Sequence, residues 1–166
     1  MKHEPLKYVI SLLAGLLWLA QAQAQDEHKT PDCQLTDIQG QTQWLSHYQG
    51  QVMYIDFWAS WCPPCVKSFP FMNHIQQQYQ QQGFKVLAVN LDENPDDAQA
   101  FIRRYKPEIS VLYDNQGRDC ARSFAVQAMP SSYLLDKKGR IRFHHLGFKK
   151  ASIPLLKRQI EQLLQE

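Results

Sequence analysis

The stretch "YIDFWASWCPPC" at residues 54–65 constrains this chain more than any other part of its sequence. Residues 52–58 are apolar apart from one acid, Asp56, and a continuous run of this kind is typical of a strand that is buried on both faces. Two cysteines, Cys62 and Cys65, follow directly and are separated only by two prolines. A pair of thiols in such a turn can be a redox centre, half of a metal site or a structural crosslink.

The residues after the pair predict that it stands at the beginning of a helix. Apolar side chains recur at helical spacing from Pro64 to about Gln82, and Gly83 is expected to end the helix. The first cysteine would then lie where unpaired N–H groups and the positive end of the helix stabilise a thiolate. The second cysteine, one turn on, can attack a mixed disulfide formed by the first. Pro63 and Pro64 stiffen the turn and remove N–H donors, so we expect them to tune the redox potential.

The number and spacing of the possible ligands argue against the other two kinds of site. A structural zinc site takes four ligands, usually from two such pairs, whereas the remaining cysteines, Cys33 and Cys120, are isolated in the sequence. The adjacent histidines His144 and His145 would point to opposite faces of a strand, so we expect no metal site there. A crosslink between residues as close as Cys62 and Cys65 stabilises a fold only a little. The pattern therefore favours thiol–disulfide exchange.

Two outcomes are open for Cys33 and Cys120. Both cysteines could be small buried hydrophobic residues, which is the commonest fate of a free cysteine. They could also form a second disulfide, because an exported chain with an even number of cysteines favours pairing. Closing the loop from 33 to 120 would stabilise the fold by about 4–5 kcal/mol in the chain-entropy model.

The first 24 residues are predicted to be a secretory signal peptide. They combine Lys2 and Lys7 with an apolar run from Tyr8 to Leu19 and the small-residue stretch "AQAQA". The alternative is a retained membrane anchor, but the run is shorter than the roughly 18–20 residues that a spanning helix needs. We therefore expect cleavage, no membrane span afterwards and, since no cysteine stands there, no lipid attachment. In the oxidising compartment outside the cytoplasm, a reduced pair would need an external electron donor.

The remaining chain is predicted to be one domain, 33–166, preceded by a flexible lead-in at 25–32. The full sequence has 18 basic and 16 acidic residues, a formal charge of +2, and removing Lys2, Glu4 and Lys7 changes this to +1. A nearly neutral domain gives no electrostatic case for nucleic acid or an anionic membrane as a partner.

Strands and helices are expected to alternate along the domain. The hydrophobic patterns predict a small hairpin within 33–51, strands at 52–58, 85–91 and 110–114, helices at 64–82, 94–105, 119–125 and 152–165, and a second hairpin within 126–147. This order predicts an α/β sandwich with a mixed sheet.

Several segments, in the same order and at similar spacing, resemble one known family. "DFWASWCPPC" resembles the active-site segment of the thioredoxin superfamily, and residues 31–165 resemble its exported TlpA/ResA-like branch. The supporting segments are "PDCQLTDIQGQTQWLSHYQGQ", which is similar to the N-terminal hairpin of that branch, "VLAVNLDEN" and "MPSSYLLDKKGRI". The resemblance implies a thioredoxin fold, a mixed sheet flanked by helices, with an N-terminal β-hairpin extension.

The resemblance also implies roles for individual residues. Cys62 becomes the exposed nucleophile and Cys65 the resolving thiol. Asp56 matches a buried acid that handles the proton of the second cysteine, a role that suits a carboxyl whose pKa is raised by burial. The alternative for Asp56 is an acid at the strand end that reaches water.

The same resemblance places a substrate-contact surface around the pair. Pro130 matches a cis-proline that packs beside the cysteines, and the backbone of the preceding residue, Met129, would pair with an extended substrate segment. Trp61, Pro63 and Pro64 would complete this surface.

These features together predict a periplasmic thiol–disulfide oxidoreductase that reduces disulfides of extracytoplasmic proteins. It would need no cofactor besides the Cys62–Cys65 disulfide, no metal, and a membrane thiol protein as electron donor. Ser68 replaces a glutamate that is common in reductases of cytochrome c maturation, which weakens that assignment. The alternatives are an oxidase or isomerase of exported proteins and, from a different class, a thioredoxin-like copper metallochaperone, although such proteins typically have C-x-x-x-C spacing.

Overall fold

The predicted buried strand lies in the middle of the sheet. It forms β3 (Val52–Trp58), in which every residue is buried. The computed structural model describes residues 32–114 and 119–166. The predicted signal peptide at 1–24, all of the lead-in except Asp32, and the turn at 115–118 lie outside the described residues.

Seven strands of the described residues form one mixed sheet in the order β2-β1-β5-β4-β3-β6-β7. The other strands are β1 (Gln34–Asp37), β2 (Thr42–Trp44), β4 (Phe84–Asn90), β5 (Ser110–Tyr113), β6 (Ser131–Leu135) and β7 (Ile141–Leu146). Strand β3 pairs in parallel with β4 and antiparallel with β6. β1 and β2 form an antiparallel hairpin that joins the sheet through β5.

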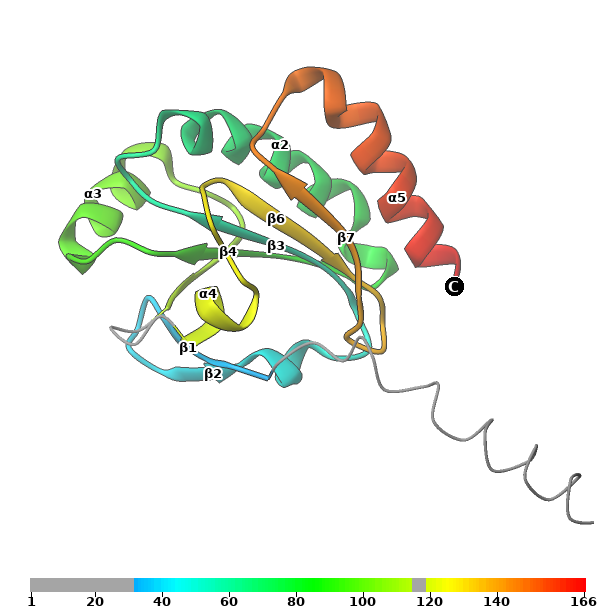
Figure 1. Cartoon of the computed structure of the whole chain (residues 1–166), viewed down its shortest axis with the longest axis horizontal. Helices are drawn as coiled ribbons and strands as arrows, with labels where there is room; N and C mark the ends of the chain where they lie inside the picture. Colours follow the sequence, from blue (N-terminus) through cyan, green and yellow to red (C-terminus); the bar gives the residue numbers. More distant parts are fainter. Residues whose placement is uncertain (1–31, 115–118) are drawn as a thin grey trace, which may run out of the picture.

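Helices cover both faces of this sheet (Figure 1). They are α2 (Pro63–Tyr79), α3 (Pro95–Tyr105), α4 (Asp119–Ser123) and α5 (Ile153–Gln165), with 3-10 turns η1 (Leu45–Tyr48), η2 (Gln80–Gln82) and η3 (Lys150–Ser152). Helices α2, α3 and α5 supply one buried apolar cluster, and α4 and the N-terminal segment supply the other. The predicted α/β sandwich with a mixed sheet and an N-terminal hairpin is confirmed.

Successive side chains of β3 point to opposite faces of the sheet. Tyr54 and Trp58 belong to the cluster under α2, whereas Ile55 and Phe57 belong to the cluster on the α4 side. Because side chains alternate along a strand, Asp56 faces the α2 side together with Tyr54 and Trp58.

Two helix ends differ from the predicted boundaries. The α-helical part of the predicted 64–82 helix ends at Tyr79 and continues as a 3-10 turn, and Gly83 ends this turn with a φ of +78°. The predicted 119–125 helix ends at Ser123, because Ala125 takes a left-handed conformation with a φ of +51° that a right-handed helix excludes. Among the described residues, no helix is long and apolar enough to cross a membrane.

Candidate active site

The two cysteines of the C-x-x-C pair form a disulfide at the beginning of α2. Cys62 is the N-cap residue, and both cysteines belong to the apolar cluster under the helix. Cys65 is fully buried and Cys62 is only 4% exposed, so the prediction of an exposed Cys62 is wrong for this disulfide form. In this form its side chain is bonded to Cys65 and packs into the same apolar cluster.

The first turn of α2 offers few hydrogen-bond donors to the Cys62 sulfur. Pro63 and Pro64 have no N–H group, and the N–H of Cys65 donates to the backbone oxygen of Cys62 at 3.0 Å. Within the described residues, the Cys62 side chain makes no capping hydrogen bond. A Cys62 thiolate would therefore feel the positive helix end with less support from N–H groups than an ordinary helix start provides.

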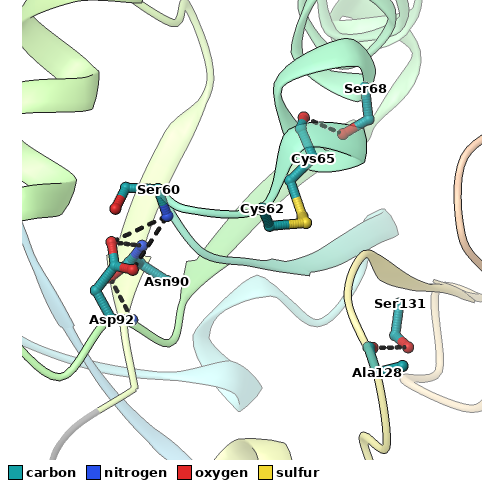
Figure 2. Close-up of a disulfide and its surroundings, with 8 residues drawn as sticks. All are labelled: Ser60, Cys62, Cys65, Ser68, Asn90, Asp92, Ala128 and Ser131. Atoms are coloured by element: carbon teal, nitrogen blue, oxygen red, sulfur yellow. Dashed lines mark hydrogen bonds between the residues drawn. A yellow bond between two sulfur atoms is a disulfide. The ribbon is translucent and has the colours of Figure 1, made fainter.

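The loop before β6 lies beside the disulfide, as Figure 2 shows through Ala128 and Ser131. The Met129–Pro130 peptide bond is cis, and Met129 packs against the cluster that contains both cysteines. The hydroxyl of Ser131 donates to the Ala128 oxygen at 2.7 Å, and the N–H of Gly147 donates to the Pro130 oxygen at 2.7 Å. These bonds fix the loop against the start of β6 and the end of β7.

The residues around the disulfide divide into a buried and an exposed group. Trp58 is buried and packs with its ring centroid 4.8 Å from that of Phe69. Trp61, by contrast, is 68% exposed, and Pro63 and Pro64 are exposed beside it. An exposed tryptophan next to a reactive pair offers an apolar contact area to an approaching protein.

Asp56 is the buried acid on the α2 side of β3. It is 1% exposed, and among the described residues its Oδ2 atom has no hydrogen-bond partner. Burial raises the pKa of Asp56 well above its ordinary value. Its burial argues against the alternative of a strand-end acid that reaches water. A protonated carboxyl on the side of the sheet that carries both cysteines can give and take protons.

Sequence reasoning missed a polar network beside the turn, which Figure 2 shows on the side away from Ala128 and Ser131. The backbone N–H of Ser60 donates to both carboxylate oxygens of Asp92, each at 3.1 Å. Asn90 also donates to Asp92, at 3.0 Å. The available signal was the position of Asn90 and Asp92 at the carboxyl end of a buried strand that is parallel to the strand before the cysteines.

A second disulfide joins Cys33 to Cys120. It links the segment before β1 to α4, on the face of the sheet opposite to α2. Both cysteines are buried. The sequence leaves open whether these cysteines are free or paired, and the structure shows them paired.

Ser68 lies one turn after Cys65, is fully buried and donates its hydroxyl to the Cys65 oxygen at 2.8 Å. It adds no charge to the site. In the part of the chain that the structure describes, no group of three or more His, Cys, Asp or Glu side chains could hold a metal ion. His144 stacks on Tyr133 while His145 bonds to Gln159, so the two imidazoles serve different contacts.

The family model described as Redoxin matches residues 25–163, and the chain belongs to this family. Among its relatives, the thiol-disulfide oxidoreductase ResA of Geobacillus thermodenitrificans is 32% identical over 112 residues, which cover 68% of this chain and 64% of that protein. ResA of Geobacillus kaustophilus is 33% identical over 112 residues, with the same coverage. The match thus spans slightly less than two thirds of the length of these relatives.

Solved structures agree with this placement. A Chlorobium tepidum chain provisionally named a thiol:disulfide interchange protein DsbE superposes with a TM-score of 0.79 at 41% identity, covering 85% of this chain and 99% of its own. A Neisseria meningitidis chain provisionally named a thioredoxin gives a TM-score of 0.74 at 28% identity. The match covers 85% of this chain and 93% of the Neisseria chain. The predicted thioredoxin fold and the resemblance to the TlpA/ResA-like branch are confirmed.

Proposed function

We propose that this protein is an extracytoplasmic thiol–disulfide oxidoreductase that reduces disulfides of other proteins through Cys62 and Cys65. The observation that carries the proposal is the Cys62–Cys65 disulfide at the start of α2, with the Met129–Pro130 loop beside it. The names of the relatives, thiol-disulfide oxidoreductase and thiol:disulfide interchange protein, support the same chemistry.

The proposed reaction passes two electrons from the reduced pair to the substrate. The Cys62 thiolate attacks one sulfur of the substrate disulfide, that bond breaks, and a mixed disulfide forms while one substrate thiolate leaves. Cys65 then loses its proton, for which Asp56 is the proposed acceptor, and its thiolate attacks the Cys62 sulfur. The Cys62–Cys65 bond forms, the second substrate thiolate leaves, and both released thiolates take up protons.

The reducing direction is supported by the absence of N–H groups at positions 63 and 64. A thiolate with few hydrogen-bond donors is less stable, which raises the free energy of the reduced pair relative to its disulfide. Such a pair tends to give its electrons away. In an oxidising compartment it must be reduced again, and we propose a membrane-bound dithiol protein as the donor.

Met129, Pro130, Trp61, Pro63 and Pro64 form the proposed contact surface for the substrate. The exposed Trp61 supplies apolar area in the turn before α2, and the half-buried Met129 lies in the loop that precedes β6. An extended segment around the substrate disulfide could pair with the backbone at Met129 while its sulfur meets Cys62.

The variant Cys65→Ser tests the exchange chemistry, because it stops the reaction at the mixed disulfide. We expect this variant to accumulate covalent adducts with exported proteins that migrate higher on a non-reducing gel and disappear on reduction. The matched variant Cys62→Ser removes the nucleophile and should form few adducts. Equal adduct formation by both variants would contradict the proposed roles, and a chain that binds copper but forms no adduct would favour the metallochaperone.

A further inference from the structure

A carboxylate holds the segment that leads into the Cys62–Cys65 turn. It belongs to Asp92, which lies just after β4, the strand that pairs with β3. The backbone nitrogen of Ser60 lies 3.1 Å from each carboxylate oxygen of Asp92, to which its N–H donates. Parallel pairing of β3 with β4 sets Asn90 beside Trp58, and Asp92 therefore reaches the segment just beyond the end of β3. In Figure 2 the carboxylate and the Ala128–Ser131 loop lie on different sides of the disulfide.

The carboxylate itself is fixed by Asn90. The Asn90 side-chain amide donates to an Asp92 oxygen at 3.0 Å, and the Asp92 N–H donates back to Oδ1 of Asn90 at 3.1 Å. Asn90 is 1% exposed and lies within β4, so Asp92 is anchored to the sheet. Beyond Ser60, the turn is closed by the Cys62 N–H, which donates to the Ala59 oxygen at 3.1 Å. A shift of Ser60 is therefore passed to Cys62 through one intervening residue.

The charge of Asp92 also acts at this end of the sheet. The pKa of Tyr113 on β5 is raised, first by burial and then by the negative charge of Asp92. A negative charge at the entry of the turn acts against a thiolate in the turn. The other ionisable groups on the elements around the pair include Asp56 in β3 and Lys67 in α2, and they are the same in every variant compared below.

We propose that Asp92 is a positioning residue that clamps the entry of the turn through Ser60 and, by its charge, disfavours the Cys62 thiolate. Both effects favour the disulfide over the dithiol. The clamp keeps the two sulfurs close, which raises the effective concentration of one thiol for the other. The charge raises the free energy of the reduced pair in its thiolate form. Asp92 thereby makes the pair a stronger reductant, an inference that rests on the proposed redox cycle of Cys62 and Cys65.

The test is the equilibrium constant of the full chain against glutathione, measured by alkylation and mass. We expect Asp92→Asn, which removes the charge and keeps one oxygen acceptor, to lower the stability of the Cys62–Cys65 disulfide by about fivefold. Asp92→Ala, which also removes the clamp, should lower it by about tenfold, a rise of about 30 mV in the midpoint potential. The control Asp96→Asn removes the same charge from an exposed position in the first turn of α3. Its equilibrium constant against glutathione should stay within about twofold of the wild-type value.

A second readout separates this role from a merely structural one. The ultraviolet absorbance of the Cys62 thiolate, followed against pH, should rise at lower pH in Asp92→Asn than in the wild type or in Asp96→Asn. A merely structural role would lower the unfolding temperature and leave both the constant and the absorbance profile unchanged, which would overturn the inference. So would an effect of Asp96→Asn as large as that of Asp92→Asn. A wild-type pair that never exchanges with glutathione would overturn the proposed function as well.

Discussion

Asp56 carries an energetic cost that depends on pH. Because burial raises its pKa well above the ordinary value, the folded chain keeps a proton there that the unfolded chain releases above about pH 4. The free energy of unfolding should therefore fall as the pH rises from about 4 to the raised pKa, by up to about 1.36 kcal/mol for each pH unit.

The variant Asp56→Asn cannot ionise, and we expect it to lose this decline, so that it gains stability relative to the wild type as the pH rises. Urea unfolding at a series of pH values measures the difference. In the same variant, resolution of the mixed disulfide should slow by about 100-fold, because the proton acceptor is gone. A wild-type stability that rises over this pH range, or a variant that resolves the mixed disulfide at the normal rate, would contradict the role given to Asp56.

The two prolines between the cysteines should have unequal effects. The side chain of an N-cap residue accepts hydrogen bonds from the second and third helical positions, and Pro64 occupies the second. Pro64→Ala therefore restores a donor for the Cys62 thiolate, whereas Pro63→Ala restores one at the first position. We expect Pro64→Ala to destabilise the disulfide by about tenfold, corresponding to one hydrogen bond to a charged group. Titration of both variants against glutathione measures this, and a larger effect of Pro63→Ala would contradict it.

Among the secondary-structure elements, the Cys33–Cys120 disulfide joins the segment before β1 to α4. The two cysteines are 87 positions apart, so their crosslink restricts the unfolded chain strongly. We expect Cys33→Ala with Cys120→Ala to lower the free energy of unfolding by about 4–5 kcal/mol in denaturant titrations. Cys62→Ala with Cys65→Ala opens a far smaller loop and should cost about 2 kcal/mol in the same model. Equal losses in the two double variants would contradict the chain-entropy explanation.

Sequence patterns predicted the elements well where the information is local. The apolar run of β3, the Asn94 cap and Pro95 at the start of α3, and Gly83 after α2 each follow from neighbouring residues. The left-handed Ala125, which shortens α4, has no local signal of this kind because glycine and asparagine are the usual residues there.

The contacts around the site depend on strand register, which the sequence does not specify. The bond between Ser60 and Asp92 joins residues 32 positions apart, and it exists because β3 and β4 pair with Asn90 opposite Trp58. The Cys33–Cys120 pairing likewise depends on how the N-terminal hairpin meets α4. Asp56, Cys62 and Cys65 could be found from the sequence, since all three stand in one short segment.

At the scale of the whole molecule, the fold gathers the site at the carboxyl ends of the parallel strands β3 and β4. There β3 and β4 end, α2 begins, and the loop before β6 returns (Figure 1). The buried Asp56 lies on the α2 side of the sheet and the exposed Trp61 lies in the turn before α2. This arrangement leaves Trp61 at the surface beside the pair, while Cys65 and the proposed proton acceptor Asp56 stay away from water.

The equilibrium of the wild-type Cys62–Cys65 pair with defined thiol and disulfide buffers tests the proposed direction most directly. All four cysteines would be followed by alkylation and mass, so that Cys33–Cys120 serves as an internal reference. We expect a midpoint near that of thioredoxin, about −270 mV, which is the value of a pair that donates electrons. A midpoint near about −120 mV, typical of a strong oxidant, would contradict the reductase and favour an oxidase of exported proteins.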